Sequence, residues 1–375
     1  MRILLAPDKF KGTLDSAAAA QAMAAGAREV FPAAEVWTQP LADGGEGSLD
    51  CVAAATAGAF STLDAQDAFG APATARVLVR GETALIAMHE TQLLRARPTP
   101  AAALRASTRG TGIVLAAAAR AFPGREIVVF VGGSASTDGG AGAAQANGWR
   151  LLDPRGRDLE PGGGALRSLA RIEPPPEPFP APVTGACDVA NLLLGDRGAA
   201  AVFARQKGAG AGEVRVLEDG LSVLADRLRG DLGVDVSHLP CGGAGGGMGA
   251  GLAAFFGARL ERAFDRIALE TSIRKKIEAA DAVVTGEGRI DAGTLGGKVV
   301  EQVARLCTSA GKPCFVVTGE VALPATLLPA ERTLGVTSVA TLVDSCGRRD
   351  AFTAPAACIR DVTARLLARQ LGEAG

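Results

Sequence analysis

Five short glycine-rich segments hold most of the residues in this chain that could do chemistry. They span residues 7–13, 42–47, 132–142, 242–251 and 285–291. Each is predicted to follow a strand and to precede a helix, which is where open α/β sheets bind their ligands. Glycine there exposes backbone N–H groups, and the N-terminus of the following helix favours a phosphate group.

Carboxylates stand in the same segments, at Asp43, Asp138, Glu287 and Asp291 among others. They would repel a bare phosphate, but they are explained if they hold Mg²⁺ or orient a substrate hydroxyl. The combination indicates a nucleotide, a metal ion and a small polar acceptor. The alternative for any one segment taken alone is a tight turn that binds no ligand. For the glycines of 242–251 the alternative is that they permit close helix packing.

Alternating strands and helices at both ends of the chain position these segments. Strands are predicted over residues 3–6, 36–41, 282–285, 315–318 and 337–342, and helices over 15–30, 46–57, 294–310 and 350–370. Asp15 is the expected N-cap of the first helix. Alternating βαβ units predict a parallel sheet that is covered on both faces. The five strands therefore predict one flavodoxin-like α/β domain built from both chain ends.

The middle of the chain has its own pattern, with paired strands over 73–79 and 83–88, a strand over 126–131, and helices over 110–121 and 137–147. A length of 375 residues suits two domains. We expect residues 1–61 plus 281–375 to form the first domain. Residues 62–280 are expected to form a larger inserted α/β domain with a mixed sheet, and the active site to lie in the cleft between the two.

Composition excludes several classes of function. Hydrophobic residues make up 48% of the chain, charged residues 21%, and the formal net charge is −1, so no long-range field draws in nucleic acid or anionic lipid. No apolar run is long enough for export or a membrane span, which predicts a cytoplasmic protein, as a monomer or homodimer. None of the seven cysteines forms a CxxC pair, which argues against a zinc site or disulfide framework.

The common nucleotide and hydrolase signatures are missing. Lys298 follows two glycines, but position 292 is Ala and position 299 is Val, so the Walker spacing fails. The protein-kinase motifs are absent, and the first strand leads into Pro7-Asp8 rather than a dinucleotide-binding glycine fingerprint. A serine hydrolase would need His89 or His238 as its base and a G-x-S-x-G elbow, which does not occur.

Taken in order, the segments resemble the bacterial type I glycerate kinase family over nearly the full chain. The matching stretches are Ala6-Pro7-Asp8 with Phe10-Lys11-Gly12, residues 42–47, residues 132–135 with 138–140, residues 186–189 with Asn191, 194–195, 198–200 and 206–208, and residues 285–291 with 294–295 and 297–298. Two stretches depart from the family pattern. Lys9 stands where the family usually has Ser, and residues 87–92 match poorly, which puts the preferred acid in doubt.

The resemblance implies transfer of the ATP γ-phosphate to a hydroxyl of glycerate with Mg²⁺, in a fold of two α/β domains. Members usually phosphorylate the 2-hydroxyl, some are recorded as making the 3-phosphate, and they serve glyoxylate and related carbon flow.

Phosphoryl transfer needs cations, a metal-holding acid and a group that orients the hydroxyl. Lys11 could neutralise the phosphate or hold the glycerate carboxylate, and Arg289 offers that carboxylate a two-pronged partner. Asp188 or Asp43 would orient the hydroxyl. Glu287 and Asp291 are the candidates for Mg²⁺, and the residues expected to line the nucleotide are Gly132, Gly133, Ser134, Asp138, Gly286 and Lys298.

Simpler roles stand beside these. Asp43 can cap a helix, Lys298 can be a solvated helix residue, and Arg289 can form a structural ion pair. Three alternatives to a glycerate kinase also stay open. They are a kinase for another small hydroxy-acid, a nucleotide- or metabolite-sensing protein of the same fold, and a structural or interaction protein.

Overall fold

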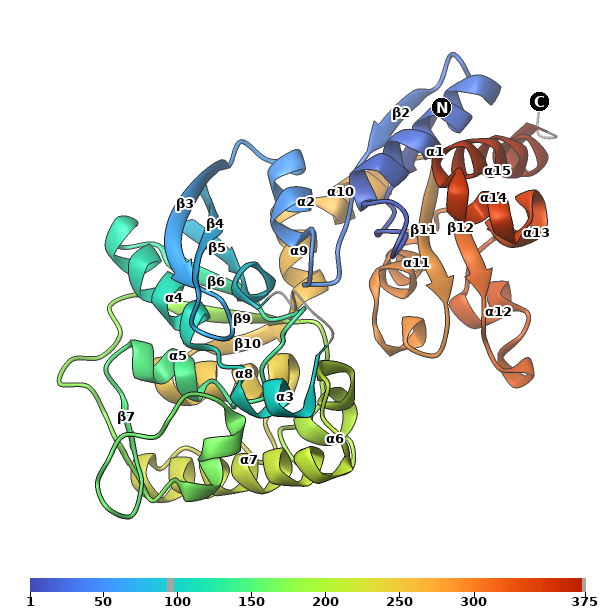
Figure 1. Cartoon of the computed structure of the whole chain (residues 1–375). Helices are drawn as coiled ribbons and strands as arrows, with labels where there is room; N and C mark the ends of the chain where they lie inside the picture. Colours follow the sequence, from blue (N-terminus) through green and yellow to red (C-terminus); the bar gives the residue numbers. More distant parts are fainter. Residues whose placement is uncertain (93–97, 373–375) are drawn as a thin grey trace. The chain divides into compact units, whose positions relative to one another are not determined.

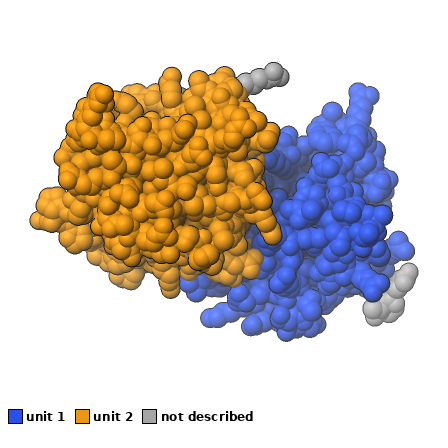
Figure 2. Space-filling model, turned by 90° about the horizontal axis from the view of Figure 1, so that it is seen from below, with its two compact units in different colours: residues 1–43, 50–56, 267–375 blue, residues 44–49, 57–266 orange. Residues whose placement is uncertain are grey.

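The computed structural model describes residues 1–92 and 98–372. It divides into two compact units, drawn in blue and orange in Figure 2. Unit 1 comprises residues 1–43, 50–56 and 267–375, and unit 2 comprises residues 44–49 and 57–266. Within the described ranges, no helix is long and apolar enough to cross a membrane.

Unit 1 is built on a five-stranded parallel sheet in the order β13-β12-β11-β1-β2. Its strands are β1 (Arg2–Leu5), β2 (Glu35–Thr38), β11 (Ala282–Ile290), β12 (Cys314–Val321) and β13 (Ser338–Thr341). Read from the other edge, this is the 2-1-3-4-5 order of flavodoxin-like sheets, so the predicted fold class is confirmed. The order reverses between β1 and β11, whose carboxyl ends therefore meet at the topological switch point.

Two layers of helices cover this sheet. On one face α1 (Ser16–Val30) and α15 (Pro355–Leu371) lie side by side (Figure 1), and they approach so closely that a Cβ at Gly26 would overlap the carbonyl of Arg360. The other face is covered by α11 (Val299–Ser309) and α12 (Ala330–Leu334), whose apolar residues pack on Ile290 and Val316. As predicted, the Asp15 carboxylate caps α1, where it accepts the N–H of Ala18 at 2.7 Å. The remaining helical elements are α2 (Ser48–Ala55), α10 (Ile273–Ala279), η4 (Thr294–Gly296), η5 (Ala325–Leu327), α13 (Leu342–Cys346) and α14 (Arg348–Thr353).

Unit 2 contains a six-stranded mixed sheet in the order β10-β9-β6-β5-β4-β3. The strands are β3 (Ala59–Gln66), β4 (Pro72–Arg80), β5 (Thr83–Ala87), β6 (Glu126–Phe130), β9 (Val183–Cys187) and β10 (Arg259–Arg262). The predicted strand pair around residues 81 and 82 is confirmed as the antiparallel β4–β5 hairpin, whereas β5, β6, β9 and β10 run parallel. The helical elements are η1 (Met88–Thr91), α3 (Pro100–Arg105), α4 (Arg109–Ala121), α5 (Ala141–Ala146), η2 (Gly163–Ser168), α6 (Ala199–Phe203), η3 (Arg205–Lys207), α7 (Ala211–Leu232) and α8 (Ala244–Phe256). A small antiparallel pair is formed by β7 (Arg150–Leu152) and β8 (Arg171–Glu173). Helix α9 (Ala263–Thr271) begins in unit 2 and ends in unit 1.

Several predicted elements need correction. The helix expected over 350–370 is two helices, because Pro355 begins α15 and holds the preceding residue out of helical geometry. The helix expected over 137–147 begins only at Ala141, since Gly139 and Gly140 take left-handed conformations (φ +63° and +79°).

Two of the five glycine segments are not strand-to-helix turns. Residues 285–291 are expected to form a turn, but β11 continues through them to Ile290 and pairs with β12. A Cβ at Gly286 would overlap the carbonyl of Val317, so this glycine permits close approach of the two strands. Residues 242–251 follow α7 and a loop rather than a strand, and they enter α8 through a left-handed run at Gly245, Gly246 and Gly247.

Candidate functional site

Two buried carboxyl groups occupy the carboxyl ends of β1 and β11 in unit 1. Asp8 follows β1 after Ala6 and Pro7, and its N–H donates to the carbonyl of Gly286 at 2.8 Å, one residue before Glu287. Asp8 is 5% exposed and Glu287 is 7% exposed. Both therefore lie at the topological switch point, the position where flavodoxin-like sheets bind ligands.

Burial raises the pKa of both groups. The pKa of Asp8 rises to about 7, mainly through desolvation and then through repulsion from Asp43, while Lys9 and Lys298 oppose the shift. The pKa of Glu287 also rises to about 7 through desolvation, against a hydrogen bond from Thr294 and the charge of Lys298. Buried carboxyl groups with strongly raised pKa values are typical of functional sites.

A short network orders the residues after β11. The hydroxyl of Thr294 donates to Oε1 of Glu287 at 2.8 Å and accepts the N–H of Asp291 at 3.1 Å. The Asp291 carboxylate accepts the N–H of Gly293 at 2.8 Å. Lys298 follows as the N-cap of α11, and its charge acts on both buried carboxyl groups. The sequence-predicted residues Gly286, Glu287, Asp291 and Lys298 are thus brought together.

The predicted catalytic residues of unit 1 are more exposed than Asp8 and Glu287. Lys11 is exposed in the turn that Phe10 and Leu14 close by a backbone hydrogen bond at 2.8 Å. Asp43 is half-buried, and its Oδ1 lies 3.4 Å from Nζ of Lys9. Arg289 points to solvent with 58% of its side chain exposed, and its Nε lies 3.4 Å from the Glu320 carboxylate. This contact is the structural ion pair that the sequence analysis gave as the alternative role of Arg289.

The residues at this edge fit a magnesium ion. The described residues contain no group of three metal-binding side chains. Mg²⁺ is usually held by only one or two carboxylates together with substrate phosphates and water. Glu287 and Asp8 offer two carboxyl groups whose ionisation is suppressed by burial, and a dication is the partner that would favour their charged forms.

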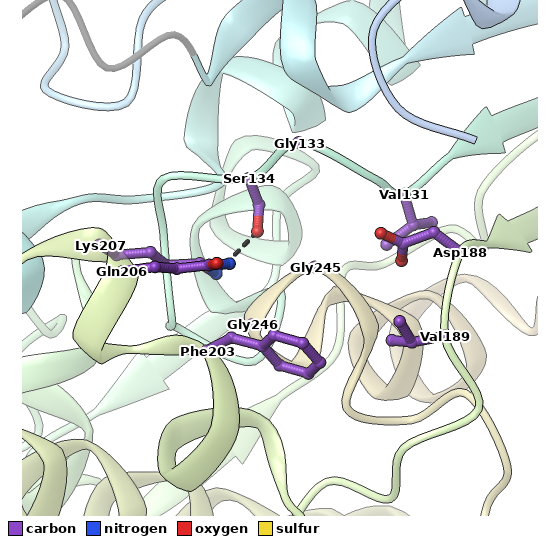
Figure 3. A pocket seen from close by; sticks show the side chains of 10 residues that line it. All are labelled: Val131, Gly133, Ser134, Asp188, Val189, Phe203, Gln206, Lys207, Gly245 and Gly246. Atoms are coloured by element: carbon purple, nitrogen blue, oxygen red, sulfur yellow. Dashed lines mark hydrogen bonds between the residues drawn. The ribbon is translucent and has the colours of Figure 1, made fainter. Parts of the chain in front are cut away.

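Unit 2 has a separate pocket with a volume of about 110 Å³. Figure 3 shows Ser134 and Lys207 pointing toward each other on one side of it, with Asp188 facing them from the other side. The remaining lining residues are Val131, Gly133, Val189, Phe203, Gln206, Gly245 and Gly246. Pockets for drug-sized ligands measure about 300–1,000 Å³. The space here suits a phosphate group or a three-carbon acid rather than a whole nucleotide.

Lys207 is the ammonium group of this pocket. It is 3% exposed, and its Nζ donates to Oγ of Ser134 at 2.7 Å and to the carbonyl of Ser136 at 2.6 Å. Desolvation lowers its pKa to about 8, although the negative charges of Asp188 and Asp138 oppose that shift. Its bonds fix the segment after β6, to which the predicted residues Gly133 and Ser134 belong.

Asp138 does not line the pocket and has a structural role instead. It is fully buried, and its carboxylate accepts the N–H and the hydroxyl of Thr108 at 2.8 and 2.9 Å. The N–H groups of Gly140 and Gly142, each at 3.2 Å, and the hydroxyl of Ser107, at 3.3 Å, complete its partners. The oxygens of Asp138 thus hold the 132–142 segment against α4, and the role of Asp138 in nucleotide binding stays a prediction.

Gly132 also serves backbone packing. Its N–H donates to the carbonyl of Gly44 at 3.1 Å, and a Cβ on Gly132 would lie 2.7 Å from that oxygen. The segments at 44–47 and 132–134 are therefore in direct contact within unit 2.

Three residues of these clusters carried no predicted role: Asp8, Lys207 and Thr294. Asp8 and Lys207 stand in segments that the sequence singled out, at Pro7-Asp8 and at 206–208. Their residue types were visible, but the burial that gives them unusual pKa values was not.

Comparisons with known proteins point to one family over most of the chain. A sequence profile of the glycerate kinase family matches residues 3–371. Glycerate 2-kinase of Escherichia coli K12 is 37% identical over 327 residues, covering 86% of each chain, and glycerate kinase of Bacillus subtilis 168 is 38% identical over 336 residues, covering 86% of this chain and 85% of that one. A crystal structure described as a glycerate kinase 2 from Salmonella typhimurium LT2 covers 100% of this chain and 99% of its own, with a TM-score of 0.81 and 34% identity.

The fold, the acidic edge and these similarities define an enzyme of the kinase class. The family is equally clear, since the profile spans nearly every residue and the relatives exceed a third in identity. The chain belongs to the glycerate kinase family.

Proposed function

We propose that this enzyme transfers the γ-phosphate of ATP to the 2-hydroxyl of D-glycerate, giving 2-phosphoglycerate and ADP. The observation that carries the proposal is the pair of buried carboxyl groups, Asp8 and Glu287, at the switch point of a chain that matches the glycerate kinase family from residue 3 to residue 371. ATP as co-substrate fits a cytoplasmic enzyme of organic-acid metabolism, including glyoxylate-linked carbon flow, acting as a monomer or homodimer.

The chain's own residues would divide the work between charge and orientation. Glu287 and Asp8, with Asp291 beside them, would hold Mg²⁺, which supplies charge neutralisation at the phosphate oxygens when bound. Lys298, Gly286 and the turn from Gly132 to Ser134 would meet phosphate oxygens. Asp188 or Asp43 would accept a hydrogen bond from the attacking hydroxyl and orient it. Lys11 and Arg289 are our candidates for the glycerate carboxylate.

Acceptor-dependent ADP release tests this proposal. Purified protein with Mg-ATP would be compared with D-glycerate, L-glycerate, lactate, tartronate and no acceptor, and phosphorus NMR would locate the new phosphate. We expect release with D-glycerate and a 2-phosphate signal. A 3-phosphate signal would move the reacting hydroxyl, and release with another acid alone would replace the substrate. ATP binding without any acceptor-dependent release would favour a nucleotide-sensing protein instead.

Matched variants assign the hydroxyl-orienting residue. Asp188→Asn and Asp43→Asn keep the shape of each side chain and remove its charge. A group that accepts the hydroxyl proton contributes about 10²–10⁴-fold to turnover, so we expect one of the two variants to lose that much kcat. Unchanged kcat in both would remove this role from the proposal. For Arg289→Ala, a raised KM for glycerate is expected if the residue holds the carboxylate, and no change if it only pairs with Glu320.

A further inference from the structure

Lys207 has hydrogen-bonding capacity that its protein partners do not use. An ammonium group carries three N–H donors. Two of them bind Ser134 and the Ser136 carbonyl, at 2.7 and 2.6 Å. Because Lys207 also lines the pocket, its third donor is available to a molecule that enters there.

The charge of Lys207 is also incompletely neutralised. Within the described residues it forms no direct ion pair with a carboxylate, although Asp188 and Asp138 attract it from a distance. Asp138 is already surrounded by the five donors described above, and Asp188 faces the pocket from the opposite side. A buried charge without a paired counter-ion is costly, and an entering anion would offset that cost.

The surrounding backbone is shaped around this ammonium group. Gly246 lies in the left-handed region at φ +72°, and a Cβ there would lie 2.9 Å from Nζ of Lys207 and overlap the Ser136 carbonyl. The opening is lined by Gly133 and Gly245 as well. The chain's other lysines are Lys9, Lys11, Lys275, Lys276, Lys298 and Lys312, all in unit 1, so unit 2 uses arginine everywhere except here. The compact ammonium fits this tight space, whereas a planar guanidinium needs more room.

We propose that Lys207 is the oxyanion-binding residue of the unit 2 pocket and that it also positions the segment from Gly133 to Ser136. The pocket would take a phosphate group or the carboxylate of a small hydroxy-acid, since both present oxyanions to an ammonium donor. The proposal rests on the proposed function in one respect, because that function decides which of these two anions binds in the pocket during turnover.

Binding experiments on the full chain test the site. Wild type, Lys207→Met, Lys207→Arg and the exposed control Lys275→Met would be titrated by calorimetry with inorganic phosphate, ADP and D-glycerate in separate runs. Hydrogen bonds to charged groups contribute about 1.5–3 kcal/mol, which corresponds to roughly 10–100-fold in affinity. We expect Lys207→Met to lose that factor for the anion that uses the pocket, and Lys275→Met to bind as wild type does. Loss for phosphate and ADP identifies a nucleotide phosphate, and loss for D-glycerate alone identifies the acceptor carboxylate.

A measurement on the wild-type protein covers the case in which the variants do not fold. With ¹³Cε-labelled lysine, the Lys207 resonance should titrate near pH 8. Saturation with the correct anion should move that midpoint upward, because a bound anion favours the charged ammonium. A purely structural lysine would show no such movement.

The outcomes separate this proposal from the kinase proposal. If folded Lys207→Met binds all three probes as wild type does, and no probe moves the midpoint, the anion site is wrong while glycerate phosphorylation stands or falls on its own assay. If wild type phosphorylates no acceptor yet binds phosphate through Lys207, the anion site stands and the proposed reaction fails.

Discussion

Nζ of Lys9 lies 3.4 Å from Oδ1 of Asp43, and the same ammonium group lowers the pKa of the neighbouring Asp8. One cation therefore acts on two carboxylates, Asp8 after β1 and Asp43 after β2. Its removal should act on both, through loss of the ion pair and through loss of the charge that favours ionised Asp8.

Lys9→Ser is expected to raise the pKa of Asp8 above its value of about 7. If ionised Asp8 is needed for Mg²⁺ and nucleotide, the acidic limb of the pH profile of kcat/KM should move to higher pH, because that profile reports groups of the free enzyme. The profile would be measured from pH 5.5 to 9 for wild type, Lys9→Ser and Lys9→Arg. If the acidic limb lies at the same pH in wild type, Lys9→Ser and Lys9→Arg, Asp8 does not control that limb.

Asp8→Asn should stabilise the protein while it removes activity. The pKa of Asp8 is about 7 in the folded protein against an ordinary value of 3.8, so the folded state binds the proton more tightly between these pH values. Stability from this group is highest below about pH 4, falls as pH rises, and levels off above about pH 7. At pH 8 the penalty is on the order of 4 kcal/mol, which the neutral amide avoids.

Urea unfolding at pH 4.5 and at pH 8 would test this effect of Asp8→Asn. We expect the gain in unfolding free energy to be larger at pH 8, with little gain at pH 4.5. Equal gains at the two pH values would contradict a cause in the ionisation of Asp8.

Asp138→Ala should destabilise unit 2 rather than weaken nucleotide binding alone. Its carboxylate satisfies donors from Ser107, Thr108, Gly140 and Gly142, and its loss leaves buried donors without an acceptor. Such unsatisfied groups cost about 1–3 kcal/mol each, so a loss of several kcal/mol is expected. Circular dichroism during urea unfolding would measure it. A variant with wild-type stability and a raised KM for ATP would return Asp138 to the nucleotide site.

Gly246→Ala and Gly257→Ala form a matched pair for the pocket. Both glycines have left-handed backbone, at φ +72° and +62°, so both variants bear a similar conformational cost of about 1 kcal/mol. Only at Gly246 would the new methyl group overlap the Ser136 carbonyl and crowd Lys207, whereas Gly257 has open space around it. We expect Gly246→Ala to be the less stable of the two and to lose anion binding. Equal thermal midpoints and equal phosphate binding would contradict the close packing around Lys207.

The sheet of unit 1 could be predicted because its strands are short runs that alternate with helices, and β1, β11 and β12 among them are strongly apolar. The extension of β11 to Ile290 could not, because Gly286 and Gly288 are equally typical of a turn. Only the partner strand decides between these structures, through the close approach at Val317. Strand β3 was also missed, since its mostly solvent-facing residues include Ser61, Thr62 and Asp64.

The candidate sites show the same division between residue type and surroundings. An acid in a glycine-rich segment is the same sequence pattern whether its carboxylate faces a ligand, as expected for Glu287, or holds the backbone, as Asp138 does. Lys207 and Ser134 are separated by 73 residues, so no local pattern reveals their contact. Family resemblance marked the segments, but burial and hydrogen bonding were needed to assign structural roles to their side chains.

The pairing of β1 with β11 has a consequence for how the chain is made on the ribosome. The N–H of Arg2 donates to the carboxylate of Asp281, which lies 279 positions further along the chain. At a synthesis rate of about 5–20 residues per second, β1 waits roughly 15–60 s for its central neighbour to emerge. Residues 44–49 and 57–266 are complete before β11 emerges, so unit 2 can fold co-translationally while β1 has β2 as a partner but still lacks β11.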